Sequence, residues 1–198
     1  VEMMGGDRLD KAVDRLLEML YHWAPLSASF RMALKDRIYL QNVKSKSVLL
    51  ELGAHAKRIW YSSDCTVIGY DCTRGNGEYV NRIYLPGDIF TDLNSFFQLK
   101  ASTSKLVVVQ GTELLCIGRE EFSALKSFDE GFDLLQQIML TEHDLQVWRG
   151  WIMTLRDEQK VREFNSRYPM YHLPNHICAS FLQMTPSRFS AIKGNFQS

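Results

Sequence analysis

The segment formed by residues 173–193 constrains the fold most, because it contains two helix-start signals separated by one short break. Pro174 and Asn175 stand where the first helix should begin, and Asn is a good N-cap. Thr185 and Pro186 mark the second start, since Thr caps a helix and Pro at the first helical position loses no needed hydrogen bond. The break between them is Gln183-Met184. The segment therefore predicts two short helices joined by a tight turn.

The polarity of this segment is compatible with two roles. Its apolar residues recur at helical spacing and predict one buried side on each helix: Ile177, Cys178, Phe181 and Leu182 in the first, Phe189 and Ile192 in the second. No Asp or Glu occurs between Pro169 and Ser198, whereas Arg188 and Lys193 are basic, which suits a surface that faces phosphates. Such a unit can place one helix in the DNA major groove. A helical hairpin that only packs on the core fits the spacing equally well.

The composition limits the possible partners. The chain has 198 residues, 45% of them hydrophobic, as expected for one large or two small globular domains. It carries 23 basic and 23 acidic residues, so any affinity for DNA must come from a local patch. The four cysteines include no CxxC pair, which predicts free thiols in a reducing cytosol. We find no membrane-spanning run and no signal peptide, so we expect a soluble, cytoplasmic protein without a membrane partner.

Residues 39–117 have a different sequence pattern, in which short β-prone runs alternate with turn signals. The predicted strands are residues 47–52, 58–62, 66–70, 78–84, 105–109 and 113–117. Turn chemistry separates them, for example Pro86-Gly87-Asp88 and Gln110-Gly111. Many short strands at regular spacing predict a β-sandwich or jelly roll. Amphipathic helices are expected before it, over residues 7–23 and after Pro25.

A long helix is predicted to follow, over residues 120–156, and a shorter one over residues 158–168. Apolar residues in the long helix recur at alternating steps of four and three, interrupted only by Thr141, and this is a heptad seam. The seam consists of Leu134, Ile138, Leu145, Trp148, Ile152 and Leu155. We favour a parallel homodimer interface; packing of this side on the chain's own core is the alternative.

In this order, a β-roll, a long dimer-type helix and a terminal helix-turn-helix resemble the Crp/Fnr family of bacterial transcription regulators, and in particular divergent members found in Bacteroidetes. The likeness is strongest at residues 84–90, 111–117 and 177–193. It implies an α+β fold with three parts. These are a cyclic-nucleotide-binding-like sensor over residues 1–126, a dimerisation helix over 127–157 and a DNA-binding domain over 158–198.

The resemblance also identifies a ligand pocket, with changed chemistry. Members that bind cyclic AMP use a Glu for the ribose and an Arg-Ser pair for the phosphate. The matching positions here are Asp92, followed by Leu93, and Ser102-Thr103. Since burying a phosphate without a counter-charge is costly, we expect no tight binding of cyclic AMP and no cofactor. The pocket is expected to hold another small effector or none.

The recognition helix departs from the family pattern as well. Ser187 and Ala191 replace the usual base-reading Glu and Arg, and Gln183 stands where the turn usually has Gly. Arg188 can compensate, because Arg to guanine is the commonest specific base contact. The residues expected to contact double-stranded DNA are Thr185, Ser187, Arg188 and Lys193.

Enzyme function is not expected. A metal-dependent jelly-roll enzyme needs a cluster of His with Glu, but the strand region offers only His55, and we predict no metal site. Phosphate-binding loops and nucleophile elbows are also missing from the sequence. Two hypotheses remain: a homodimeric DNA-binding regulator with a degenerate cyclic-nucleotide pocket, or a dimeric ligand-sensing or protein-interaction module that has lost sequence-specific DNA binding.

Overall fold

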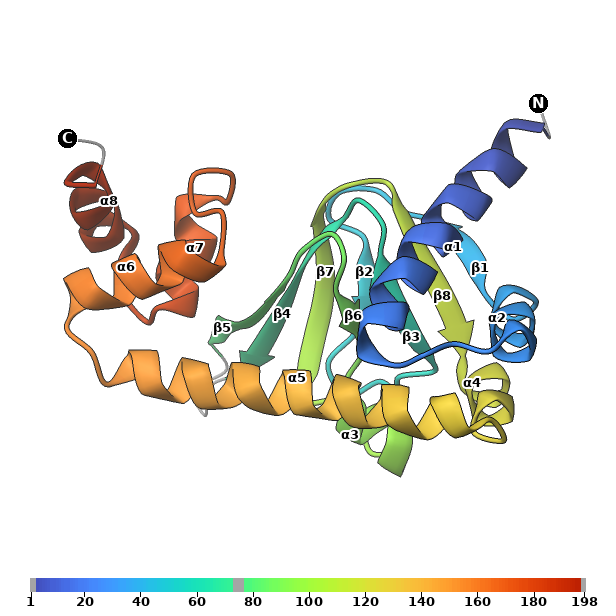
Figure 1. Ribbon diagram of the computed structural model, residues 1–198. Helices are drawn as coiled ribbons and strands as arrows, with labels where there is room; N and C mark the ends of the chain where they lie inside the picture. The colour runs from blue at the N-terminus through green and yellow to red at the C-terminus, as the bar shows by residue number, and fades with distance from the viewer. Residues whose placement is uncertain (1–2, 73–76, 197–198) are drawn as a thin grey trace.

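The computed structural model describes residues 3–72 and 77–196. The chain begins with helices α1 (Met3–Trp23) and α2 (Ala28–Lys35), both expected from the sequence. Ser27 caps α2 by accepting a hydrogen bond from the backbone N–H of Phe30. Phe30 and Leu34 are buried. Figure 1 shows α1, in blue, crossing the face of the β-sheets.

The strands form a β-roll of two four-stranded antiparallel sheets. One sheet has the order β1-β8-β3-β6 and the other β2-β7-β4-β5. Their bounds are β1 Tyr39–Asn42, β2 Val48–Leu50, β3 Arg58–Ser62, β4 Thr66–Cys72, β5 Glu78–Tyr84, β6 Ile89–Phe90, β7 Ser104–Gln110 and β8 Glu113–Gly118. The predicted jelly roll is confirmed. The sequence missed only the short strands β1 and β6, which are set by pairing with β8 and β3.

The turn between β7 and β8 depends on Gly111. Its φ of +101° lies in the region that favours glycine, and a Cβ there would come within 2.4 Å of the Cα of Cys65. Asp64 fastens the same turn, since its carboxylate accepts hydrogen bonds from the backbone N–H groups of Thr112 and Glu113. This turn, which connects the two sheets, is therefore fixed by Gly111 and by the Asp64 carboxylate.

The long helix of the sequence prediction is two helices. Helix α4 spans Arg119–Leu125 and α5 spans Asp129–Met153. Residues 126–128 separate them, and the acidic Asp129 and Glu130 follow in the first turn of α5, where they complement the helix dipole. Because α5 ends at Met153, Leu155 lies outside the helix.

The C-terminal unit comprises α6 (Asp157–Arg167), α7 (Asn175–Phe181) and α8 (Pro186–Gly194). The predicted helix-turn-helix is confirmed in detail. The Thr185 hydroxyl accepts a hydrogen bond from the N–H of Arg188, and Gln183 adopts the left-handed conformation, with φ of 55°, at the position where glycine is usual. In Figure 1, α5 runs past the β-roll and leads into this unit.

Two apolar clusters stabilise these parts. The first fills the β-roll and extends beneath α1 and α2. The second is the core of the C-terminal unit, and it includes Ile68, Val80 and Ile83 from β4 and β5. The backbone N–H of Val80 also donates a hydrogen bond of 2.9 Å to the hydroxyl of Ser180 on α7. The helix-turn-helix is therefore packed directly on one sheet.

Candidate nucleic-acid interface and sensor pocket

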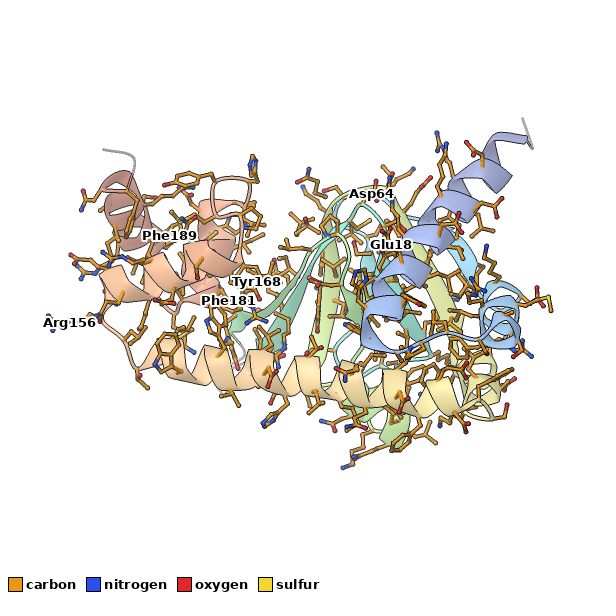
Figure 2. All side chains as sticks on the ribbon, in the orientation of Figure 1. Glu18, Asp64, Arg156, Tyr168, Phe181 and Phe189 are labelled. Atoms are coloured by element: carbon orange, nitrogen blue, oxygen red, sulfur yellow. The ribbon has the colours of Figure 1, made fainter. Side chains whose placement is uncertain are left out.

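Helix α8 has one buried and one exposed side. Phe189 and Ile192 are buried in the core of the C-terminal unit, and Figure 2 shows Phe189 within this unit. The exposed positions opposite them carry short side chains: Ser187, Ser190, Ala191 and Gly194. Thr185 and Arg188 are exposed next to this face. The surface that could enter a groove is thus small and polar, with one long basic side chain at its edge.

Arg188 is directed toward α6 by an ion pair. Its Nε donates to Oδ2 of Asp157 at 2.6 Å, and its side chain remains 62% exposed. Asp157 also lies 3.8 Å from Nζ of Lys160. Such a surface pair is worth at most about 1 kcal/mol, so the guanidinium can exchange partners at small cost.

Lys193 is placed differently from the other three predicted DNA contacts. Its ammonium donates to the carbonyl of Met170 at 3.1 Å and to Oδ1 of Asn175 at 3.0 Å. It also lies 4.9 Å from the centroid of the Tyr171 ring. In this position Lys193 ties α8 to the segment between α6 and α7 and points into the unit, whereas Thr185, Ser187 and Arg188 are exposed.

The predicted ligand residues of the β-roll come together around helix α3 (Leu93–Gln98). Asp92 caps this helix by accepting from the N–H of Ser95 at 2.9 Å. The same carboxylate accepts from the hydroxyl of Ser102 at 2.7 Å and the N–H of Thr103 at 3.3 Å. Asp92 and Ser102 are therefore bonded directly to each other, and the Asp92 carboxylate holds residues 102–103 beside the start of α3.

Sequence reasoning missed the cation of this pocket. Asp92, Leu93 and Thr103 line a cavity of about 360 Å³ that also contains Arg82 of β5 and Glu142 of α5. Nε of Arg82 donates to Oε1 of Glu142 at 2.7 Å. Burial alone would lower the pKa of Arg82, but the Glu142 carboxylate outweighs it and raises that pKa above its usual value. No local motif marks this pair, because its members are 60 positions apart.

The polar groups of the cavity are bonded mainly to one another. Asp71 accepts from Nδ2 of Asn81 at 2.6 Å and from the hydroxyl of Ser104. With Asp92 and Glu142, it gives three carboxylates beside the single guanidinium of Arg82. A phosphate would meet a net negative lining in which the cation is already paired, which makes this cavity a poor site for an anion.

The predicted heptad seam lies on the side of α5 that faces its own chain. Leu134, Leu145 and Ile152 are buried within one chain. Ile138 lines two internal cavities, and Trp148 and Leu155 pack against the core of the C-terminal unit. The contacts that these six residues make lie within their own chain, which favours the core-packing alternative; their assignment to an interface between copies stays a prediction.

A second apolar stripe occupies the opposite, exposed side of α5. It consists of Phe132, Met139, Leu140, Val147 and Trp151, which are 70%, 55%, 45%, 58% and 48% exposed. At 3.6 residues per turn these positions fall on one face, nearly opposite Leu134, Leu145 and Ile152. The exposed polar residues Gln136 and His143 lie on the same face. Isolated exposed apolar residues are common, but five of them on one face of a helix are typical of a contact surface.

Among the residues that the structure describes, no group of three or more His, Cys, Asp or Glu side chains could hold a metal ion. None of the described helices is long and apolar enough to cross a bilayer.

A β-roll with a long helix leading to a terminal helix-turn-helix is the fold of the Crp/Fnr regulators. Three solved structures with this fold are FixK2 from Bradyrhizobium japonicum, a protein described as a transcriptional regulator of the Crp/Fnr family from Eubacterium rectale, and the c-di-GMP-responsive regulator CLP from Xanthomonas campestris. The Eubacterium protein is named as a transcriptional regulator and CLP as a global regulator.

The likeness covers most of each chain. FixK2 has a TM-score of 0.71 at 10% identity, over 81% of this chain and 84% of that one. The Eubacterium protein has 0.68 at 13%, over 89% and 88%, and CLP has 0.64 at 12%, over 86% and 92%. No protein-family model and no curated protein matches the sequence. The protein thus has the Crp/Fnr fold, established by structure at low sequence identity.

Proposed function

We propose that the protein is a homodimeric DNA-binding transcription regulator of the Crp/Fnr type, working in the cytoplasm. The observation that carries this proposal is the helix-turn-helix at the end of α5, with Thr185, Ser187 and Arg188 exposed along one side of α8. Hydroxyl groups at a helix N-terminus suit phosphate and sugar contacts, which fix the register on a duplex.

Arg188 is the residue proposed to read bases. Its bond to Asp157 keeps the guanidinium at the edge of α8 in the free protein. A guanine edge or a phosphate offers acceptors that match the guanidinium fork better than a single carboxylate oxygen. In the complex, Arg188 exchanges Asp157 for DNA.

The proposed dimer contact is the exposed stripe of α5 defined above. Two copies packed along Val147 and Trp151 would remove these side chains from water. The inner side of α5 would keep its contacts with the β-roll and the C-terminal unit. A two-fold dimer of this kind presents two copies of α8, as binding to a symmetric operator requires.

The Asp92 cavity is proposed to be closed to cyclic AMP. Its single guanidinium is paired with Glu142, and Asp92 is bonded to Ser102. Binding a cyclic phosphate there would require breaking an internal ion pair beside two further carboxylates. Any effector of this protein is accordingly a different small molecule.

The test is fluorescence anisotropy with a labelled duplex from the region upstream of the protein's own coding sequence. We expect binding that weakens steeply between about 50 mM and about 200 mM salt. Arg188→Ala should weaken it about tenfold, since an Arg–guanine contact is worth about 1–3 kcal/mol. Lys35→Ala is the matched control, because it removes a surface cation on α2 and should bind like the parent.

One observation favours a second candidate. The outward face of α8 has only short side chains at Ser187, Ser190, Ala191 and Gly194, and such a face lets another protein surface approach closely. In that case the unit docks a protein partner. The absence of any salt-dependent binding to duplex DNA would favour this candidate and contradict the first.

A further inference from the structure

A second cavity, of about 170 Å³, lies where the three parts of the chain meet. The β-roll contributes Tyr84 and Asp88, α5 contributes Leu145, and the end of the C-terminal unit's first helix contributes Arg167 and the adjoining Tyr168. In Figure 2, Tyr168 lies between the C-terminal unit and the β-sheets. This second cavity adjoins the Asp92 cavity, with which it shares four lining residues, namely Tyr84, Thr91, Leu93 and Glu142. Arg167 and Tyr168 of the C-terminal unit line only this second cavity.

The walls of this cavity are aromatic and apolar. The rings of Tyr84 and Phe90 stack with their centroids 4.7 Å apart, and Trp23 and Leu145 add apolar surface. Burial raises the pKa of Tyr84 and raises the pKa of Tyr168 to about 12. Both phenols therefore remain neutral at physiological pH, and the interior presents a ring-lined space suited to an apolar group.

Two charged side chains of the cavity, Arg167 and Asp88, can still form hydrogen bonds with a ligand. Arg167 has no hydrogen bond or ion pair within the described part of the chain, and its guanidinium lies 4.9 Å from the centroid of the Trp148 ring. Asp88 is exposed, and its carboxylate accepts a hydrogen bond from the N–H of Leu85 at 2.7 Å. Burial raises the pKa of Asp88, and the hydrogen bond from Leu85 and the charge of Arg167 oppose this rise. Glu142 also lines the cavity but is already paired with Arg82.

We propose that this cavity binds a free amino acid with an apolar side chain. The side chain lies in the cavity against Tyr84, Phe90 and Leu145, which line it. The carboxylate pairs with Arg167, for which a planar guanidinium is well suited, and the ammonium pairs with Asp88. A zwitterion matches a lining that has one available charge of each sign, whereas a simple acid or a simple amine leaves one of them unmatched.

The consequence of binding is a link between sensor and helix-turn-helix. The affinity for a molecule that contacts both Asp88 of the β-roll and Arg167 of α6 depends on the distance between these two parts. Binding would therefore favour the arrangement in which both contacts form. The binding itself does not depend on whether the protein recognises DNA.

The first experiment is isothermal titration calorimetry of the full chain with L-leucine and L-phenylalanine. The matched probes are 4-methylpentanoate, which lacks the ammonium group, 3-methylbutylamine, which lacks the carboxylate, and L-serine, which lacks the apolar side chain. We expect saturable binding of at least one of the two apolar amino acids and at least about tenfold weaker binding of all three matched probes. No saturable binding of either amino acid, or equal binding of the acid or the amine, would overturn the proposal.

The second experiment uses variants with the amino acid that binds. Arg167→Gln and Asp88→Asn should each weaken binding about tenfold, because each removes one charge-assisted contact. Asn at position 88 retains an oxygen that can accept from Leu85. Arg162→Gln is the control, since Arg162 is exposed on the same helix and lies over the Phe196 ring instead. Equal affinity in Arg167→Gln and the parent would place the ligand elsewhere and contradict the assignment.

Discussion

Arg82 of β5 and Glu142 of α5 form an ion pair that connects the sheet to the long helix. Nη2 of Arg82 lies 2.5 Å from Oε1 of Glu142, and the two side chains are only 10% and 22% exposed. Nη1 of Arg82 donates to the carbonyl of Asn81 at 3.0 Å. The pair lines the same cavity as Asp92. The guanidinium in that lining is therefore already paired with a carboxylate of the protein itself.

Glu142→Gln should destabilise the protein. It leaves the buried guanidinium of Arg82 without a counter-charge, at a cost of about 2–3 kcal/mol given the partial exposure of Glu142. Urea denaturation of both proteins measures this difference in the free energy of unfolding. Asp144→Asn removes a carboxylate from an exposed position on the same helix and should change stability by less than about 0.5 kcal/mol. Equal stability of Glu142→Gln and Asp144→Asn would show that the ion pair does not stabilise the fold.

Asp64 gives stability a defined pH dependence. Burial alone would raise its pKa, but hydrogen bonds from Thr112 and Glu113 outweigh burial and lower that pKa below the ordinary value of 3.8. Because the pKa is lower in the folded state, the carboxylate stabilises the protein at pH values above the ordinary pKa. This contribution is lost as the pH falls through the lowered pKa of the folded state. Asp64→Asn should therefore cost about 1 kcal/mol at pH 7.

The check for Asp64 is to measure unfolding of parent and variant at neutral and at acidic pH. The difference should shrink as the pH falls below 3.8 and the parent carboxyl takes up its proton. A difference that is the same at both pH values would mean that the carboxylate charge is not involved.

The two sides of α5 should respond differently to a charge. Trp151 is 48% exposed, so Trp151→Glu is expected to leave the fold intact and convert the proposed dimer to a monomer. Trp148 packs against Tyr168 and Phe181, so Trp148→Glu is expected to destabilise the C-terminal unit by about 3 kcal/mol. Light scattering and thermal unfolding of both variants separate the two effects. A Trp151→Glu protein that remains dimeric would exclude this face as the interface.

The α5 pattern shows where prediction from sequence stops. Residues such as Leu134 and Ile152 form a heptad seam, and the same spacing fits packing on a sheet or on a second helix. Apolar residues occur on both sides of α5, so the pattern alone could not decide which side is buried. The sequence pattern also did not predict the break between α4 and α5, although Asp129-Glu130 is a helix-start signal that could have indicated it.

Sequence patterns predicted correctly those features that depend only on neighbouring residues. The Thr185-Pro186 start and the turn at Gln183 are determined by neighbouring residues, and the structure has both as predicted. The Asp92 pocket was located through its resemblance to a family, but its cation was missed. Arg82 acquires its role from Glu142 and from the β4–β5 pairing, and such contacts between distant positions leave no local pattern.

Asp157 should restrain DNA binding. Because it holds Arg188 at 2.6 Å, Asp157→Asn weakens the competing bond and removes a negative charge near the duplex. We expect affinity for the upstream duplex to increase about two- to fivefold at low salt. Glu158→Gln removes the neighbouring charge without releasing Arg188 and should have the smaller effect. If both variants gain equally, the increase reflects net charge and not the release of Arg188.

The most direct test of the central proposal is selection of duplexes from a random-sequence library by the full chain, followed by sequencing. A homodimer that reads DNA through α8 should enrich a two-fold symmetric site with half-sites centred about 10 base pairs apart. Arg188→Ala should lose or alter the preferred base in both halves. Failure to enrich any sequence above the unselected library, or an identical motif with Arg188→Ala, would contradict the proposal that this protein reads DNA through Arg188.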